Sequence, residues 1–531
     1  MNGGGSTIRF ASANNNQRAV VQLNGTDYTT INNLVIDATG GPGATPTYGY
    51  GVLLTNAADN DQLTNNTIVA DGAATSTNFA GIAVNGSTSN ASATGNSANN
   101  LLVQGNTITG GYYGISLYGG SATAQNTGNV VRNNTIRDFY SYGIYVGFQL
   151  GAQLVGNDIS RPLRTSVSAF YGIGVLGQCN GLAIEKNRLH DAFTGNNASV
   201  AQLYGIYLSG NGSTSTVTND IVNNVLYNLS GGGTQYLIYA GAPYTRIYNN
   251  TLTSDDQSAN SLYVTYAFYV LGANTDIKNN IVRVTRSGTG LKYGVYLASS
   301  TGVVFTNYND LYVPAGNVGY YAANFATLAN WQAGAGSTFD QNSVSVEPIF
   351  ASAGTGNLAP GDVSLNNSAT PLARVTDDIT GAPRGAAPDM GAYEFAPVAI
   401  DVLPVGLASP APTAACYGTA EPLAVQLRNS GAAVLNLATN PAAVTVVVTP
   451  PTGAAQTFTA TVSTGTLASG ATLSVTLPGT LNMAAPGTYA FAITATAVGD
   501  LNPGDDVLSP AVTRLVVAPV AGTLAASAAG T

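Results

Sequence analysis

The chain has 531 residues, with 17 Lys and Arg against 26 Asp and Glu, so its formal net charge is −9. Charged residues make up 8% of the sequence, against about 25% in an ordinary globular protein, whereas the apolar fraction of 45% is ordinary. This composition excludes a disordered chain, which is rich in charge, and a nucleic-acid binder, which needs a basic surface. No apolar run approaches the roughly 20 residues of a membrane-spanning helix, so we expect no membrane span.

The first residues, Met1-Asn2-Gly3-Gly4-Gly5, have neither the basic nor the apolar region of a signal peptide. We therefore expect the sequence to be a fragment of a longer chain. Its two cysteines, Cys179 and Cys416, fall in different predicted domains, which argues against a disulfide framework.

A short phrase of the form apolar-x-x-Asn-x-apolar recurs along the first three fifths of the chain, and its first copy is at Asn33. Successive copies are 23 to 40 residues apart. Such irregular spacing favours a coil of β-strands, which tolerates loop insertions, over a helical repeat, which does not. The asparagines of the other copies are Asn66, Asn106, Asn134, Asn157, Asn187, Asn224, Asn250, Asn280 and Asn309.

Each copy of the phrase predicts one strand that stops at the asparagine and a second strand that starts directly after it. A bend this sharp favours a left-handed backbone, which asparagine adopts more readily than other residues with a side chain. In stacked coils the side-chain amides can also hydrogen-bond along the axis as a ladder. We therefore predict a structural role for these asparagines.

A second phrase, Tyr-Gly-Ile or Tyr-Gly-Val, lies between successive asparagines, so each repeat consists of three short strands. With both phrases in phase, residues 6–322 resemble the right-handed parallel β-helix repeat proteins, a superfamily that contains the pectate-lyase-like proteins. The resemblance implies an all-β solenoid. The second phrase starts at Tyr50, Tyr113, Tyr142, Tyr171, Tyr204 and Tyr293.

We predict that the β-helix spans residues 1–322. Three further parts follow it. Residues 323–395 resemble the closing segment of many secreted bacterial β-helix proteins. Residues 396–519 contain Val- and Thr-rich strands separated by Pro and Gly, which predicts an immunoglobulin-like β-sandwich. Residues 520–531 are expected to start a further segment.

Strand alternation in Tyr-Gly-Ile-x-apolar places Ile inside the solenoid and the residue x outside. In the later coils x is a tyrosine, which predicts an aromatic stripe that could stack on sugar rings and donate hydrogen bonds from its hydroxyls. The alternative is that cross-strand aromatic stacking only stabilises the sheet. The stripe consists of Tyr145, Tyr207, Tyr239, Tyr269 and Tyr296, with Tyr321 as a possible extension, and position x is Leu53, Ala83, Ser116 and Gly174 in other coils.

Most of the concentrated charge follows the third strand in three neighbouring coils, where a loop is expected to return to the tyrosine stripe. The family resemblance implies binding or cleavage of acidic polysaccharides, and a lyase would need a cation for the uronate and a base for the C5 proton. The alternative is a solvated cluster of ion pairs, each worth under about 1 kcal/mol. The candidate cations are Arg137, Arg161 and Arg188, the candidate bases are His190 and Tyr145, and Asp138, Asp158, Arg164 and Asp191 lie among them.

Other catalytic centres are poorly represented in the sequence. Acids do not recur in register, as a calcium-dependent lyase or a glycosidase would require, and one histidine with two distant cysteines cannot form a zinc site. Asp505 and Asp506 fall in a predicted turn, which we interpret as a loop rather than a calcium site. We therefore predict no metal and no cofactor.

The leading functional prediction is a secreted or cell-surface module that binds a polysaccharide or surface glycan and is not an enzyme. A polysaccharide lyase that uses the charged loops is the first alternative. A purely structural spacer is the second.

Overall fold

The computed structural model describes residues 1–210, 212–257, 262–299, 304–334, 338–412, 417–508 and 511–517. The chain divides into two compact units. The first unit contains Met1–Pro360 and Leu365–Phe395, and the second contains Gly361–Ser364 and the described residues from Ala396 onward. Within the described ranges, no helix combines the length and the apolar character needed to cross a membrane. The predicted segment 520–531 and Cys416 lie outside the described residues.

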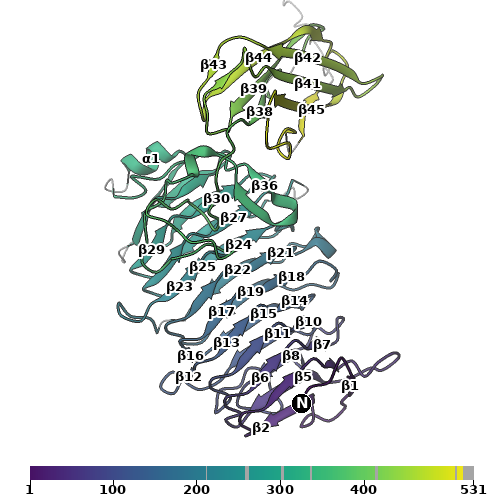
Figure 1. Cartoon of the computed structure of the whole chain (residues 1–531). Coiled ribbons are helices and arrows are strands. Elements are labelled where there is room, and N and C mark those ends of the chain that lie inside the picture. The colour runs from purple at the N-terminus through teal and green to yellow at the C-terminus, as the bar shows by residue number, and fades with distance from the viewer. Residues whose placement is uncertain are drawn as a thin grey trace, which may run out of the picture. The chain divides into compact units, whose positions relative to one another are not determined.

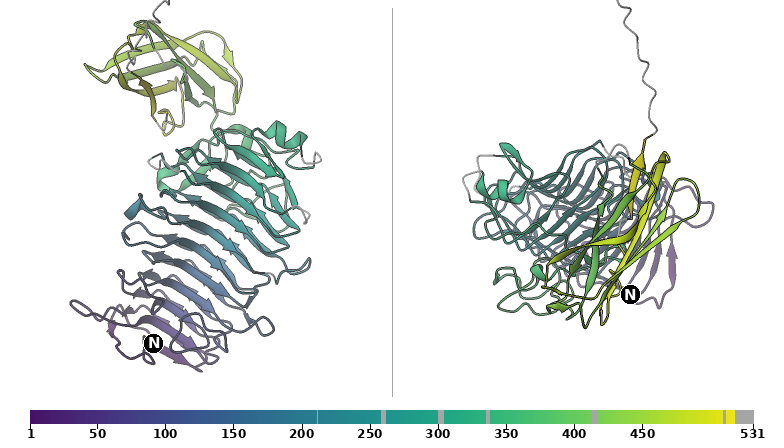
Figure 2. Two further views of the ribbon diagram at one scale, coloured as in Figure 1. Left: turned by 180° about the vertical axis from the view of Figure 1, so that it is seen from behind. Right: turned by 90° about the horizontal axis from the view of Figure 1, so that it is seen from above.

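The first unit is a right-handed parallel β-helix of about ten turns, which confirms the predicted fold class (Figures 1 and 2). Successive turns add strands to three long sheets, in which neighbouring strands are parallel except for the final pair, β34 and β35. Sheet I contains β3 (Thr30–Asn32), β6 (Gln62–Thr64), β9 (Leu102–Gln104), β13 (Val130–Arg132), β17 (Gln153–Val155), β20 (Ala183–Glu185), β23 (Asn219–Val222), β26 (Thr245–Tyr248), β29 (Thr275–Lys278) and β32 (Val304–Asn307). Sheet II contains β1 (Thr7–Arg9), β4 (Val35–Asp37), β7 (Thr67–Val69), β10 (Thr107–Thr109), β14 (Thr135–Arg137), β18 (Asp158–Ser160), β21 (Arg188–His190), β24 (Val225–Tyr227), β27 (Thr251–Ser254), β30 (Ile281–Val284) and β33 (Asp310–Tyr312). Sheet III contains β2 (Ala19–Asn24), β5 (Gly49–Thr55), β8 (Phe79–Val84), β11 (Tyr113–Tyr118), β15 (Tyr142–Gly147), β19 (Phe170–Val175), β22 (Leu203–Leu208), β25 (Gln235–Ala240), β28 (Thr265–Val270), β31 (Lys292–Leu297), β34 (Asn317–Tyr321) and β35 (Ala323–Phe325).

The interior of the β-helix is filled by apolar side chains that stack in register from coil to coil. In sheet II, Ile108 pairs with Ile136, and Ile136 pairs with Ile159. All three side chains are completely buried. Burial of a side chain of this size contributes about 1.5–3 kcal/mol, so these rows supply much of the stability of the solenoid.

An asparagine ladder runs along the bend between sheets I and II, through the nine asparagines from Asn66 to Asn309. The side-chain amide of each of the first eight donates to the side-chain oxygen of the next, for example from Asn106 to Asn134 at 2.9 Å and from Asn157 to Asn187 at 3.0 Å, and the amide of Asn309 donates to Asp340 at 2.9 Å. The same amide also donates to a backbone carbonyl of the preceding coil. These buried polar groups are therefore satisfied within the protein.

Two predicted details of this bend are wrong. Asn33 does not belong to the ladder, because Leu34 occupies the equivalent position and its backbone N–H donates to the side-chain oxygen of Asn66. The left-handed residue is the one before each ladder asparagine, as at Asn65 with φ 55° and Asn133 with φ 52°. The bend and the ladder are thus made by two neighbouring residues rather than by one.

The glycine of the Tyr-Gly-Ile phrase fits where a side chain would not. A Cβ on Gly143 would lie 2.5 Å from Cγ2 of Ile159. Along sheet III, Tyr142 pairs with Tyr171 and Ile144 with Ile173, whereas the intervening glycines are not paired. This irregularity breaks the strict alternation, so both the tyrosine of the phrase and the residue three positions later project outward.

The second unit is a small β-sandwich of antiparallel sheets. Side chains from both sheets share one core, for example Val425 and Val475 with Val446 and Phe491. The immunoglobulin-like assignment stays a prediction. One sheet contains β38 (Val402–Ser409), β39 (Glu421–Asn429) and β44 (Thr472–Leu481), the other contains β42 (Gln456–Val462), β41 (Ala442–Thr449), β45 (Gly487–Ala497) and β46 (Val512–Val516), and β40 (Leu435–Asn436) pairs with β43 (Thr466–Leu467).

Candidate functional site

Two rows of tyrosines lie on the outer face of sheet III, and we call this surface the tyrosine face. The second row contains the five tyrosines predicted from the sequence, whereas the first row comes from the Tyr-Gly-Ile phrase itself and was not predicted to face outward. The first row is Tyr142, Tyr171, Tyr204, Tyr236, Tyr266 and Tyr293, and the second is Tyr145, Tyr207, Tyr239, Tyr269, Tyr296 and Tyr320.

The rings of the tyrosine face form a herringbone. Neighbouring rings of the first row have centroids 4.5–5.5 Å apart and planes within 17° of each other. Rings of the two rows meet nearly at right angles, as for Tyr204 and Tyr207 at 5.1 Å and 77°. A ring in the middle of a row has a neighbour on each face, so it offers solvent mainly its edge and its hydroxyl. The sugar stacking predicted from the sequence therefore has little free ring face to use.

The extent of the tyrosine face differs from the prediction at both ends. In the earlier coils Leu53, Ala83 and Ser116 are buried, because a loop that includes Ala91 packs over them. At the other end, Tyr320 stacks on Tyr296 with centroids 4.3 Å apart.

The predicted extension of the row at Tyr321 is therefore wrong. Tyr321 contacts Phe339 instead, with ring centroids 5.7 Å apart. The second row is also interrupted once, at Gly174, where a Cβ would lie 2.9 Å from the Tyr142 ring.

Three hydroxyls of the second row are available to a ligand. Tyr207, Tyr239 and Tyr269 are half-buried, and within the described part of the chain their hydroxyls make no hydrogen bond. Burial, followed by the neighbouring tyrosines, raises the pKa of Tyr239 to about 12, so its phenol keeps its proton at physiological pH. The central part of the tyrosine face thus presents neutral hydroxyls that can both donate and accept.

A second group of polar residues, which we call the charged corner, lies on sheet II. It consists of Arg137 on β14, Asp158 on β18, Arg188 and His190 on β21, and Asp191 directly after β21. Asp158 and Arg188 are register partners. The two arginines make no ion pair within the described residues, so their charge is open to solvent or to an anion.

His190 is held between two carboxylates. Its Nδ1 donates to Asp191 at 2.6 Å, its Nε2 donates to Asp158 at 3.2 Å, and its ring stacks on Tyr227 with centroids 4.7 Å apart. Burial lowers the pKa of His190, but the hydrogen bonds and charges of the two carboxylates outweigh it and raise the pKa to about 9. The imidazole is therefore a cation at neutral pH.

The charged corner lacks a suitable general base for the lyase chemistry predicted from the sequence. A general base must accept a proton near the working pH, and His190 already carries one. For the other candidate base, burial and the neighbouring tyrosines raise the pKa of Tyr145, so its phenolate is scarce.

Arg161, predicted to neutralise a substrate carboxylate, does not face solvent. Its side chain is completely buried, and its N–H groups donate to the carbonyls of Ala192 at 2.9 Å and Tyr140 at 2.6 Å. Its guanidinium also lies over the rings of Phe170 and Phe193. Arg161 therefore stabilises the loops around it, and the prediction that it contacts a ligand is wrong.

Arg164 is likewise buried and is engaged with Asp138. Its Nη1 donates to the carbonyl of Asp138 at 3.1 Å, and the Asp138 carboxylate accepts from its backbone N–H. These two residues belong to the loop structure rather than to an open surface.

The charged corner and the tyrosine face project from different sheets. Arg137, Asp158, Arg188 and His190 belong to strands of sheet II, not to a loop that returns to sheet III. The loops that follow these strands do lead into sheet III as predicted, because residues 138–141 join β14 to β15, residues 161–169 join β18 to β19 and residues 191–202 join β21 to β22. The charged side chains on the strands nevertheless project from sheet II, so the two surfaces are considered separately.

The closing segment, residues 323–395, covers the outer side of the later coils on sheets I and II, and on sheet III it reaches the end of the tyrosine face, where the Tyr293 hydroxyl donates to Asn324 at 3.1 Å. Tyr227 packs with Ile379 and Tyr393, and Val222 and Tyr248 pack with Val375. In the described chain, no tyrosine of the tyrosine face belongs to these apolar clusters. The tyrosine face is thus the outer surface that the later coils leave open.

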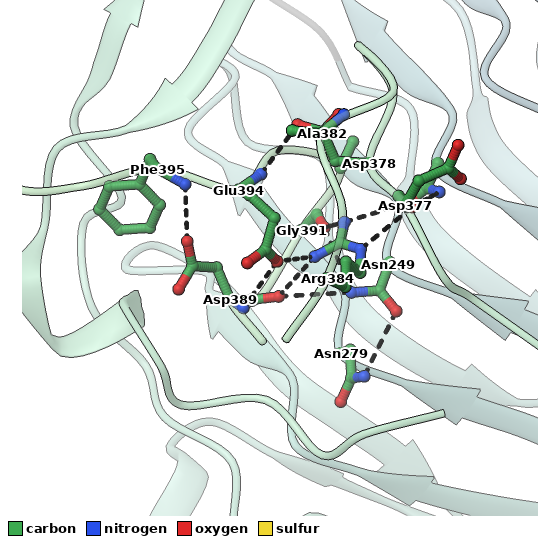
Figure 3. A network of polar contacts seen from close by, with 12 residues as sticks. Asn249, Asn279, Asp377, Asp378, Ala382, Arg384, Asp389, Gly391, Glu394 and Phe395 are labelled. Atoms are coloured by element: carbon green, nitrogen blue, oxygen red, sulfur yellow. Dashed lines mark hydrogen bonds and ion pairs between the residues drawn. The ribbon is translucent and has the colours of Figure 1, made fainter. Parts of the chain in front are cut away.

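Arg384 fastens the closing segment to the β-helix (Figure 3). Its side chain is 3% exposed and forms an ion pair with Glu394. The same guanidinium donates to the side-chain oxygen of Asn223 at 3.0 Å and to the carbonyl of Gly391 at 2.8 Å. In the figure, Asn249 and Asn279 approach this network from the solenoid. Every contact of this buried cation is internal, so we assign it a structural role.

Comparison with known proteins supports the solenoid. Residues 95–252 match the family model for a right handed beta helix region. No curated protein matches the sequence. Among solved structures, the chain is similar to a tailspike protein, gp49 from Acinetobacter baumannii bacteriophage Fri1, a capsular polysaccharide depolymerase, at 10% identity over 94% of this chain and 82% of that chain. The TM-score of 0.21 is too low to support a shared fold, so the assignment of the fold is based on the strand pairing and the ladder described above.

Proposed function

We propose that the protein binds a polysaccharide along the tyrosine face and acts as a secreted or cell-surface glycan-binding module without catalysis by the charged corner. The supporting observation is the double row of outward tyrosines, in which the hydroxyls of Tyr207, Tyr239 and Tyr269 have no partner within the described chain. The coils repeat about every 4.8 Å, so the hydroxyls form a long periodic array that suits a long periodic ligand.

The chemistry of the face favours recognition by hydrogen bonds. The strands β15, β19, β22, β25 and β28 carry no charged residue. A ligand on this surface would meet phenolic hydroxyls and the positively polarised edges of aromatic rings. We therefore expect binding that changes little with salt, because screening weakens contacts between charges far more than hydrogen bonds.

The test is a glycan array probed with the whole chain and with a variant that carries Tyr207→Phe, Tyr239→Phe and Tyr269→Phe. Phenylalanine keeps the herringbone packing and removes only the hydroxyls. Each hydrogen bond contributes about 0.5–1.5 kcal/mol, so loss of three should weaken binding roughly tenfold or more. Tyr28→Phe is the matched control, since Tyr28 is 80% exposed and lies outside the tyrosine face.

Three outcomes separate the candidate functions. Binding that the triple variant loses and Tyr28→Phe retains supports the proposal. Absence of binding to any glycan by the folded protein would favour a spacer. Appearance of unsaturated uronate product on incubation with an acidic polysaccharide, with loss of that product in Arg188→Ala, would favour a lyase at the charged corner.

A further inference from the structure

Charged residues are nearly absent from sheet III, although they recur on the other two sheets. Sheets I and II carry several each, for example Arg246 on sheet I and Arg188 on sheet II. Among the described strands of sheet III, most of which are longer, the one charged residue is Lys292. It is 5% exposed, and its ammonium group donates to two backbone carbonyls. The tyrosine face is therefore the uncharged side of the solenoid.

The loops that border the tyrosine face on the side of sheet I are also uncharged. Their sequences contain no Asp, Glu, Lys or Arg. A ligand that extends across the face toward sheet I would meet no charge in these loops. They follow β15, β19, β22, β25 and β28 and comprise residues 148–152, 176–182, 209–218, 241–244 and 271–274.

The loops on the opposite flank enter sheet III from sheet II, and their cations are buried. Arg161 and Arg164 donate to backbone carbonyls, as described above. Arg286 is 2% exposed, and its guanidinium donates to the carbonyl of Gly233 at 3.0 Å and to the hydroxyl of Thr265 at 3.1 Å. In the described loops between β14 and β31, no cation is therefore exposed to neutralise an anionic ligand.

Negative charge is disfavoured on this side of the molecule. The half-buried Asp138 and Asp256 lie in the same loops, and the whole chain has a net charge of −9. The phenols of the face show the same preference for neutral groups. Burial, followed by the neighbouring tyrosines, raises the pKa of Tyr239 to about 12 and also raises the pKa of Tyr236. A carboxylate or sulfate on this face would lose hydration without gaining a counter-charge.

We propose that the tyrosine face binds a neutral polysaccharide and discriminates against acidic ones. This inference rests on the function proposed above and names the chemical class of its ligand. The hydroxyl groups of a neutral sugar can exchange hydrogen bonds with Tyr207, Tyr239 and Tyr269, whose hydroxyls both donate and accept. A neutral sugar thereby replaces the hydrogen bonds that it loses to water, whereas a uronate or sulfate group needs a cation that the face does not offer.

The experiment measures binding of the whole chain to immobilised polysaccharides in pairs that share a backbone and differ in charge. The pairs are fully methyl-esterified and de-esterified homogalacturonan, hydroxyethyl cellulose and carboxymethyl cellulose, and dextran and dextran sulfate. We expect binding to a neutral member and at least about tenfold weaker binding to its acidic partner. Binding to the neutral member should persist from about 0.01 M to about 1 M sodium chloride, over which the Debye length falls from about 30 Å to about 3 Å.

Two variants assign the binding to a surface. The variant with Tyr207→Phe, Tyr239→Phe and Tyr269→Phe should bind the neutral polysaccharide roughly tenfold more weakly or worse. The variant with Arg137→Ala and Arg188→Ala removes the two unpaired cations of the charged corner and should bind it as the unchanged protein does. Acidic binding that only this second variant loses would support the inference, because it places the anion away from the tyrosine face.

The remaining outcomes separate this inference from the proposed function. Equal or tighter binding of an acidic partner that the charged-corner variant retains and the tyrosine variant loses would overturn the inference and leave polysaccharide binding at the tyrosine face intact. Failure of the folded protein to bind any of the neutral polysaccharides would also overturn it. The proposed function would be overturned as well only if the glycan array showed no binding.

Discussion

The asparagine ladder and the tyrosine face are both built by repetition of one residue per coil, yet they differ in what their polar atoms do. Each ladder amide is buried and has donors and acceptors satisfied by the neighbouring coils. Tyr207, Tyr239 and Tyr269 of the outer face stack on one another, but their hydroxyls are left without a partner in the described chain. Repetition alone therefore does not indicate function. The unsatisfied, accessible polar group does, and this distinguishes a binding surface from a structural element.

The largest effect on stability is expected inside the ladder. Asn157→Ala removes an amide that donates to the carbonyl of Val131 and to Asn187, and whose oxygen accepts from Asn134. Each buried group left unpaired costs about 1–3 kcal/mol, so the free energy of unfolding should fall by about 4 kcal/mol in chemical denaturation. Asn197→Ala, in an exposed loop, is the control and should change it little. A small effect of Asn157→Ala would show that the ladder is not what holds the coils together.

His190 lies on the exterior, but both of its ring nitrogens have hydrogen-bond partners within the protein, as the ladder amides do. Its pKa is raised from 6.5 to about 9 in the folded protein, so its contribution to stability is full below pH 6.5 and is lost as pH rises to about 9. Since each pKa unit corresponds to about 1.4 kcal/mol, the contribution is on the order of 3 kcal/mol.

Denaturation between pH 6 and 10 tests this, with His190→Gln for comparison. The unchanged protein should lose stability over that interval, and the variant should show a flatter profile. Equal slopes for both proteins would mean that His190 is not a structural cation, and the charged corner would regain interest as a catalytic site.

A smaller loss is expected at the glycine of the Tyr-Gly-Ile phrase, at coils where its neighbours leave no room for a side chain. Gly143→Ala places a methyl group 2.5 Å from Ile159 and 2.6 Å from the carbonyl oxygen of Gly172. Overpacking of this kind costs about 1–3 kcal/mol, measured as a drop in the free energy of unfolding. Gly354→Ala, where a Cβ meets nothing within 4 Å, is the matched control. If Gly143→Ala is as stable as the control, the glycine is not needed for the strand irregularity.

The sequence predicted what depends on local pattern and missed what depends on distant segments. The in-phase phrases were enough to predict the β-helix, and the spacing of Asn66 to Asn309 was enough to predict stacked amides. Counting by strict alternation placed only Tyr145 and its equivalents outside, because the count ignored the irregularity that an isolated glycine such as Gly143 introduces into a strand. The same irregularity occurs where Leu237 and Ala267 replace the glycine, so the glycine alone does not encode the first tyrosine row.

The remaining errors concern contacts that no local pattern encodes. Arg161 is buried because its loop folds against Ala192, Tyr140 and two phenylalanine rings from neighbouring coils.

The most direct test of the account is to measure glycan affinity and the free energy of unfolding together in the variant with Tyr207→Phe, Tyr239→Phe and Tyr269→Phe. The stacked rings are retained and the lost hydroxyls have no internal partner, so stability should stay within about 0.5 kcal/mol of the unchanged protein, as for other surface changes. Affinity should fall roughly tenfold or more. Unchanged affinity, or a loss of affinity that only follows a loss of stability, would contradict the claim that this face binds a polysaccharide through its hydroxyls.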